Sequence, residues 1–166
     1  MNQSSHTSVS EQLIVLFNLN NEEFALPVNQ VREVIKIPEV TKLPGTADYV
    51  QGVVTIRGKV IPVINLKKRF RLPVNGIQES SKIIIAESGR EVVGLIVDHV
   101  NEVKKINLHE IQMQPQIIEQ TANRYIEGVV FEKEDMYIII NLEKIFAINE
   151  LLQLSSNISG NEVVIT

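Results

Sequence analysis

The chain has 166 residues, of which 44% are hydrophobic and 22% charged, with no cysteine and a formal net charge of −4. This composition fits one soluble globular domain or two small ones that share a core. The lack of cysteine excludes disulfides and thiolate metal sites and favours a cytosolic location. The negative net charge opposes binding to nucleic acid.

Six short strands are predicted from runs of β-branched and aromatic residues bounded by turn residues. Asn20-Asn21 is predicted as the turn of the first hairpin, and Gly89 lies in the turn of the third. They lie, in chain order, at 13–19, 23–27, 50–56, 60–64, 82–86 and 92–97.

Other local signals place turns, helices and an edge. Asn65 and Asn141 are good N-caps, which predicts short helices at about 65–70 and 141–154. Pro62 lacks an N–H, so its strand is predicted to lie at a sheet edge or to carry a bulge there. No apolar run reaches 18 residues, so we expect no direct membrane insertion.

The chain contains an internal repeat in two blocks. Tyr49–Phe70 and Tyr125–Phe146 share 9 of 22 positions without a gap, and Ile14–Ile37 and Ile83–Ile106 share 9 of 24. Residues common to both copies are expected to build the fold, whereas residues that differ are better candidates for function. Strands with regular turns, repeated twice, predict small β-barrels.

The repeat divides the chain into expected units. The loop-like stretch 71–81 separates the copies, so we expect a first barrel unit at 11–75. A second unit with a C-terminal helix is expected at 80–152, and strand exchange between the units stays open. Residues 1–10 are expected to be a disordered lead, without a signal peptide, and 153–166 a tail.

Within each copy, Val28 and Val31, and likewise Val97 and Val100, are three residues apart. This spacing predicts one helical turn before an extended segment. Val31 and Val103, which lie in the matched V..EV elements of the two copies, are interpreted as core residues in preference to contact surface. Apolar residues at the seam of two barrels still offer a groove for a partner helix.

Catalytic and metal-binding signatures are missing from the sequence. It has no GxSxG elbow, no phosphate-binding loop and no dinucleotide fingerprint. Of the histidines, His6 lies in the lead, His99 replaces Gln30 of the first copy, and His109 lacks a second ligand four residues on. Paired carboxylates lie in predicted turns, so we expect a binding protein that is not an enzyme and holds no metal or cofactor.

The copies differ most at the tip of the second hairpin of each unit. The first copy has Ile56–Lys59 (IRGK) there, and the second has Glu132–Asp135 (EKED). A tip is exposed, and the planar guanidinium of Arg57 can bind a carboxylate or carbonyl through two bonds. Arg57 is therefore a candidate contact residue, although a surface charge beside a turn glycine explains it as well. The basic cluster Lys67, Lys68, Arg69 and Arg71 is interpreted as a solvated face.

Three motifs carry a family resemblance over about residues 11–150. GVVTIRGKVIPVINL, preceded by LPG and YVQ, resembles the F-I-x-G-V-x-N-L-R-G-x-I-x-P-V-x-[DN]-L motif of the CheW family of chemotaxis coupling proteins. VVGLIVDHVNEV and YIEGVVFEKEDMYIIINLEKIF are similar to the family's later motifs. The chain departs from the pattern with Thr55 in place of Asn and with Lys67-Lys68 where an Arg often follows the Leu.

The resemblance implies two tandem SH3-like five-stranded β-barrels packed together, and a non-enzymatic adaptor. The implied partners are the regulatory domain of the histidine kinase CheA and the cytoplasmic tips of methyl-accepting chemotaxis receptors. It implies a cytoplasmic protein, recruited to membrane arrays by its partners and expected to be monomeric when free. By position, the family's interaction residues fall on Val31, Glu33, Gly52, Arg57, Gly58, Ile83 and Val103.

Three alternatives stay open, and the first of them, the isolated CheW-like part of a larger signalling protein, belongs to the same class of binding module. A CheV-type protein adds a receiver domain to a CheW-like part, and residues 147–166 are too few for one. A small β-barrel enzyme or ligand-binding protein needs a buried polar cluster near the seam. A nucleic-acid-binding barrel needs aromatic and basic residues on one sheet, and aromatic residues are only 5% of this chain.

Overall fold

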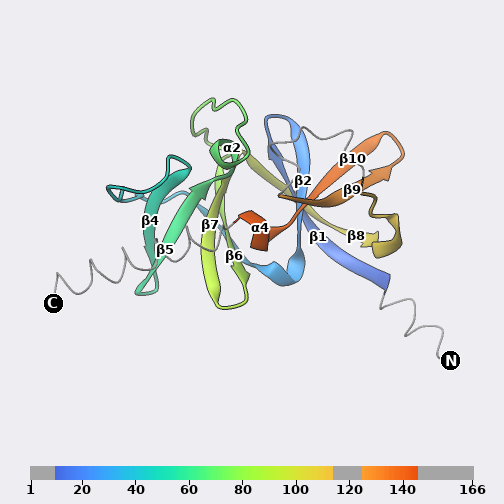
Figure 1. Cartoon of the computed structure of the whole chain (residues 1–166), viewed down its shortest axis with the longest axis horizontal. Coiled ribbons are helices and arrows are strands. Elements are labelled where there is room, and N and C mark those ends of the chain that lie inside the picture. The colour runs from blue at the N-terminus through green and yellow to red at the C-terminus, as the bar shows by residue number, and fades with distance from the viewer. Residues whose placement is uncertain (1–9, 114–124, 146–166) are drawn as a thin grey trace.

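The structure is a computed structural model that describes residues 10–113 and 125–145, and it contains two five-stranded sheets (Figure 1). Sheet 1 has the order β8-β1-β2-β10-β9 and sheet 2 the order β3-β6-β7-β5-β4. The strands of sheet 1 are β1 (Glu11–Leu19), β2 (Glu22–Pro27), β8 (His99–Asn107), β9 (Ile126–Glu132) and β10 (Asp135–Ile140). The strands of sheet 2 are β3 (Val31–Lys36), β4 (Val50–Ile56), β5 (Lys59–Asn65), β6 (Lys82–Ser88) and β7 (Glu91–Val97).

The two copies of the repeat exchange strands. Sheet 1 combines β1 and β2 of the first copy with three strands of the second, and sheet 2 combines β6 and β7 of the second copy with three strands of the first. Within each sheet the copies meet in a parallel pair, β2 with β10 and β5 with β7. Each sheet therefore contains strands of both copies. The division into units at 11–75 and 80–152 stays a prediction.

The six predicted strands are confirmed, with ends that shift by no more than two residues. The predicted turn Asn20-Asn21 is confirmed, and both residues have positive φ, 51° and 68°. Such a turn matches the twist of a two-residue hairpin, and Asn tolerates this conformation well. Mainly β structure with few short helices is therefore correct.

Short helices follow β5 and β10, as the two asparagines predicted. α2 (Leu66–Arg69) begins after Asn65, whose side chain accepts a hydrogen bond from the Lys68 N–H at 3.3 Å. α4 (Leu142–Ile145) follows Asn141 in the same way, and the rest of the predicted helix 141–154 lies outside the described residues. In the described part of the chain, no helix is long and apolar enough to cross a membrane.

The predicted helical turn before the extended segment is present in only one copy. In the first copy, the 3-10 helix η1 (Val28–Gln30) follows Pro27, whose φ of −57° leads into a helical turn. The second copy has no proline there, and β8 begins at His99 after a single bend at Asp98, so the prediction is wrong for that copy. A second 3-10 helix, η2 (Leu108–Glu110), follows β8.

Pro62 does not mark an edge strand, so that part of its prediction is wrong. β5 lies between β4 and β7. However, the pairing of β5 with β7 begins only at Val63, one residue after the proline. Since Pro62 precedes that ladder, its missing N–H removes no hydrogen bond from it.

The core has a shared part between the sheets and a separate part within each. Along β6, Ile84 packs into the shared cluster, whereas Ile83 and Ile85 pack within sheet 2. Strands buried on both faces need continuous apolar runs, which explains the sequence Ile-Ile-Ile-Ala in β6. We call the shared cluster the seam; it includes Phe17, Leu19, Phe24, Leu26, Tyr49, Leu66, Phe70, Leu95, Val97, Tyr125, Leu142 and Ile145.

Candidate functional site

Two of the sequence-predicted site residues, Arg57 and Glu33, form an ion pair on sheet 2. Nη1 of Arg57 donates to one carboxylate oxygen of Glu33 at 2.6 Å, and Nη2 donates to the other at 3.2 Å. Arg57 lies at the tip of the β4–β5 hairpin and Glu33 on β3, and the sheet order places β3 and β4 at its two opposite ends. The side chain of Arg57 is 74% exposed and that of Glu33 30%, so the pair lies at the surface rather than enclosed.

The backbone of the tip holds Arg57 in this position. Arg57 and Gly58 both have positive φ, 49° and 79°, in the two-residue turn between β4 and β5. Glycine adopts this conformation without steric cost, and a Cβ at Gly58 meets open space. Gly58 therefore shapes the turn that carries Arg57.

The ion pair shifts the pKa of both groups towards the charged form. The hydrogen bonds from Arg57 lower the pKa of the Glu33 carboxyl, opposed by partial burial and helped by the charges of Arg57 and Arg32. The same hydrogen bonds raise the pKa of the Arg57 guanidinium. The pair stays ionised near neutral pH, so it places a fixed charge pattern on the surface.

Gly52 is required by a close approach of two backbone segments. Its φ is 147°, and a Cβ at this position lies 2.2 Å from the backbone oxygen of Thr41. Thr41 and Val53 exchange backbone hydrogen bonds of 2.9 and 2.8 Å, which holds the segment before β4 against that strand. A Cβ at the corresponding Gly128 of the second copy would likewise collide with the Ile111 side chain and the Gln112 backbone oxygen. Gly52 thus builds the fold, as its presence in both copies suggested.

The three aliphatic site residues differ in exposure. Ile83 is fully buried within sheet 2, so it does not reach the surface. Val31 is half-buried and packs against the seam. Val103 is 57% exposed on the edge strand β8, so its interpretation as a core residue is wrong. The matched V..EV elements are edge strands, and an edge strand leaves part of one face to solvent.

The second hairpin carries a counterpart ion pair with reversed polarity. Lys104 of β8 pairs with Glu132 at the end of β9 at 2.7 Å, and its Nζ also donates to the Tyr137 hydroxyl at 2.9 Å. These two hydrogen bonds raise the pKa of Lys104. In sheet 2 the acid is on the edge strand and the base at the tip, and in sheet 1 the reverse holds. The sequence reading missed this pair because its charges do not occupy equivalent positions in the two copies.

The prediction that the basic cluster is a solvated face is wrong for Lys67 and Arg69, whereas Lys68 is half-buried and Arg71 is exposed. The Lys67 side chain is only 5% exposed and pairs with Asp98 at 2.7 Å. The guanidinium of Arg69 lies 4.3 Å from the ring centre of Tyr49 and 4.7 Å from that of Tyr125, and its Nε donates to the Ile145 carbonyl. Both side chains therefore act at the seam.

The described residues contain no cluster of potential metal ligands. Over 10–113 and 125–145, no three His, Cys, Asp or Glu side chains gather closely enough to hold a metal ion. His99 and His109 are both exposed, and His6 lies outside the described residues.

Comparisons with known proteins agree in one family. Residues 13–150 match the model of the CheW-like domain. The chemotaxis protein CheW of Bacillus subtilis is 34% identical over 138 residues, which cover 83% of this chain and 88% of that protein. CheW of Klebsiella aerogenes is 29% identical, with 84% of each chain covered. The crystal structure of the scaffolding protein TtCheW from Thermoanaerobacter tengcongensis matches with a TM-score of 0.78 and 38% identity, covering 84% of this chain and 94% of that one.

Proposed function

The chain belongs to the CheW-like family of non-enzymatic chemotaxis scaffolds, with its SH3-like fold, and we propose that it couples the histidine kinase CheA to methyl-accepting chemoreceptors. It binds the CheA regulatory domain and the cytoplasmic tips of the receptors. It acts in the cytoplasm and joins membrane arrays through these partners.

The observation that carries the proposal is the exposed Arg57–Glu33 pair. Both residues were assigned to the family's interaction surface by position, and they lie in hydrogen-bond contact. A planar, fully charged guanidinium at a hairpin tip can exchange its intramolecular carboxylate for a partner's carboxylate or carbonyl. Arg is also enriched among residues that dominate binding energy.

Exposed apolar residues extend the candidate surface beyond this pair. Val34 is 40% exposed and directly follows Glu33 in β3. Val60 is 37% exposed and lies in β5, close to the tip of the β4–β5 hairpin. Val103 adds a third exposed apolar side chain, on sheet 1. Apolar side chains beside a bidentate charge suit a protein interface, whose core is apolar and whose rim is polar.

The test is titration calorimetry of the full chain against two partners separately, the CheA regulatory domain and a receptor tip fragment. The variant Arg57→Asp places two carboxylates beside each other at the tip. Lys133→Asp is its matched control, because Lys133 is the equivalent residue of the second hairpin and also has positive φ, 56°.

We expect the unmodified chain to bind both partners saturably, and Arg57→Asp to weaken one of the two affinities at least about tenfold. The partner affected identifies which surface contains Arg57. Lys133→Asp is expected to bind both normally. Absence of binding to either partner by the unmodified chain contradicts the proposed function, and unchanged affinities in Arg57→Asp contradict the site.

A further inference from the structure

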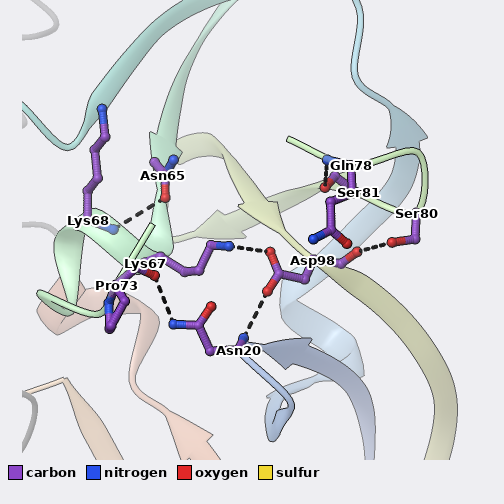
Figure 2. A network of polar contacts seen from close by, with 9 residues as sticks. All are labelled: Asn20, Asn65, Lys67, Lys68, Pro73, Gln78, Ser80, Ser81 and Asp98. Atoms are coloured by element: carbon purple, nitrogen blue, oxygen red, sulfur yellow. Dashed lines mark hydrogen bonds and ion pairs between the residues drawn. The ribbon is translucent and has the colours of Figure 1, made fainter. Parts of the chain in front are cut away.

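Asp98 lies where the chain passes from sheet 2 to sheet 1, and its backbone and carboxylate are all engaged (Figure 2). Its N–H donates to the Asn18 carbonyl at 3.0 Å, and its carbonyl accepts from the Ser80 hydroxyl at 2.9 Å. One carboxylate oxygen pairs with Lys67 Nζ at 2.7 Å. The other accepts from the Asn20 N–H at 2.8 Å.

These partners belong to both sheets. Asn18 and Asn20 lie in the β1–β2 hairpin of sheet 1. Lys67 lies in α2, directly after β5 of sheet 2, and Ser80 lies just before β6 of the same sheet. We call Asp98, Lys67, Asn20 and Ser80 the Asp98 clamp, because Asp98 connects the two sheets through all of its polar groups.

The Lys67–Asp98 ion pair of the clamp is largely buried. The Lys67 side chain is 5% exposed, whereas that of Asp98 is 19% exposed. Within the described residues, the carboxylate of Asp98 is the one anion paired with this buried cation. A buried cation needs its counter-ion, because an unpaired charge away from water is unfavourable. Lys67 therefore holds Asp98, and through it the β1–β2 hairpin, in one position.

A second contact supports the same connection. Nδ2 of Asn20 donates to the Pro73 carbonyl at 2.8 Å (Figure 2). Pro73 belongs to the loop that follows α2 on the sheet 2 side. The hairpin of sheet 1 is thus attached to sheet 2 by a backbone N–H and by a side-chain amide of one residue.

At the equivalent crossing from β2 to β3, the described residues form no such clamp. The repeat offsets of 69 and 76 place Asn29 and Glu143 at the positions of Asp98 and Lys67. Both are exposed, and neither makes a side-chain hydrogen bond or ion pair with another described residue. A buried side-chain oxygen without a hydrogen-bond partner in the described residues is found at both crossings, on Gln30 here and on Asn20 in the clamp, so the contrast between them lies in the ion pair. Among the residues that the structure describes, an ion pair therefore links the sheets at one crossing and not at the other.

We propose that the Asp98 clamp fixes the angle between the two sheets, and that Asp98 and Lys67 are positioning residues for coupling. The inference rests on the proposed function. Candidate partner residues lie on both sheets, Glu33 and Arg57 on sheet 2 and Val103 on sheet 1. Breaking the Lys67–Asp98 ion pair is expected to leave the candidate surface of each sheet intact and to change the angle between the two sheets. The sheets would then rotate relative to each other about the β2–β3 crossing.

The angle is measured directly by electron–electron double resonance between two spin labels. Because the chain has no cysteine, cysteines introduced at Thr55 of β4 and Asn101 of β8 label one exposed site on each sheet. The test variant is Lys67→Met. Its matched control is Lys105→Met, which removes a lysine paired with Glu11 at 3.3 Å within sheet 1.

We expect a narrow distance distribution in the unmodified chain and in Lys105→Met, and a broader distribution in Lys67→Met. If Lys67→Met does not fold, the double variant Lys67→Met/Asp98→Asn replaces it. The double variant removes both charges and keeps an acceptor for Asn20, so it leaves no unpaired buried charge. A distribution as narrow as that of the unmodified chain in a folded variant overturns the proposal.

The functional arm separates binding from coupling. In the clamp variant, the affinities for the CheA regulatory domain and for the receptor fragment are each expected to change by less than about threefold, or less than about 0.7 kcal/mol. Receptor control of the kinase in the three-part complex is expected to be lost. Normal control despite a broadened distribution overturns the positioning role. If the unmodified chain binds neither partner, the proposed function fails, and the label distances still decide whether the clamp sets the angle.

Discussion

The β4–β5 and β9–β10 hairpins lie at opposite ends of the molecule and are alike at their bases but different at their tips (Figure 1). At the bases, Gly52 and Gly128 admit a crossing backbone, and Asn65 and Asn141 cap the following helices. At the tips, an exposed arginine stands in one copy and acidic residues in the other. The comparison indicates that the base of the hairpin builds the fold and that the tip is free to carry function.

The largest expected effect is at the base of the first hairpin. Gly52→Ala forces a Cβ against the Thr41 carbonyl in a conformation that favours glycine. We expect it to lower the free energy of unfolding by about 3 kcal/mol or more. Gly58→Ala, at the tip, meets open space and should cost only about 1 kcal/mol. Urea unfolding measures both, and equal losses contradict the division into base and tip.

The helix caps give a smaller effect that sharpens the comparison. Asn65→Ala removes the acceptor of the Lys68 N–H, and Asn141→Ala removes that of the Lys144 N–H. Each is expected to lower the free energy of unfolding by about 1 kcal/mol. Asn65 is buried and Asn141 is half-buried, so the loss at Asn65 should be the larger one. A negligible loss at both positions, measured by thermal unfolding, argues against the shared asparagines as fold-building residues.

The ion pair at the first tip is expected to support partner binding, and the one at the second tip is expected to support stability. Lys104→Met removes contacts to Glu132 and Tyr137 and should lower the free energy of unfolding by less than about 1 kcal/mol, with no change in partner affinity. Arg57→Met should shift the unfolding midpoint only slightly, because its ion pair is exposed, and should weaken partner binding. The reverse pattern, in calorimetry and urea unfolding of both variants, contradicts the assignment of function to the first tip.

The smallest expected effect is a dependence on pH. Since Arg57 lowers the folded-state pKa of Glu33, this pair stabilises the protein above the ordinary carboxyl pKa. The contribution is lost as the pH falls through the lowered pKa. An NMR titration of the Glu33 carboxyl should show its midpoint rise towards the ordinary value in Arg57→Met. An unchanged midpoint shows that the ion pair does not form in solution.

Local features of the fold were predictable, because they depend on neighbouring residues. The β-branched runs of β4 and β6, the Asn20-Asn21 turn and the cap at Asn65 each act within a few residues. The repeat also separated Gly52, which both copies share, from Arg57, which only one copy has. The structure places Arg57 beside Glu33, a second site residue 24 positions away in the chain.

Long-range features were not predictable from the same signals. The charge run at Lys67 has the appearance of a solvated surface, because its counter-ion, Asp98, is distant in sequence and follows a different strand. The exposure of Val103 depends on the position of β8 at a sheet edge, and the exchange of strands depends on two parallel pairings between the copies. Such pairings leave no local pattern in a single sequence.

The most direct test of the division between base and tip is a tip exchange within one chain. Arg57→Lys combined with Gly58→Glu gives the first hairpin the two tip residues of the second, Lys133 and Glu134. Partner binding, by calorimetry against the CheA regulatory domain and the receptor fragment, is measured beside thermal unfolding of the same sample. The account predicts a melting temperature within a few degrees of the unmodified chain and loss of one of the two binding reactions. Retention of both, or collapse of the melting temperature, contradicts it.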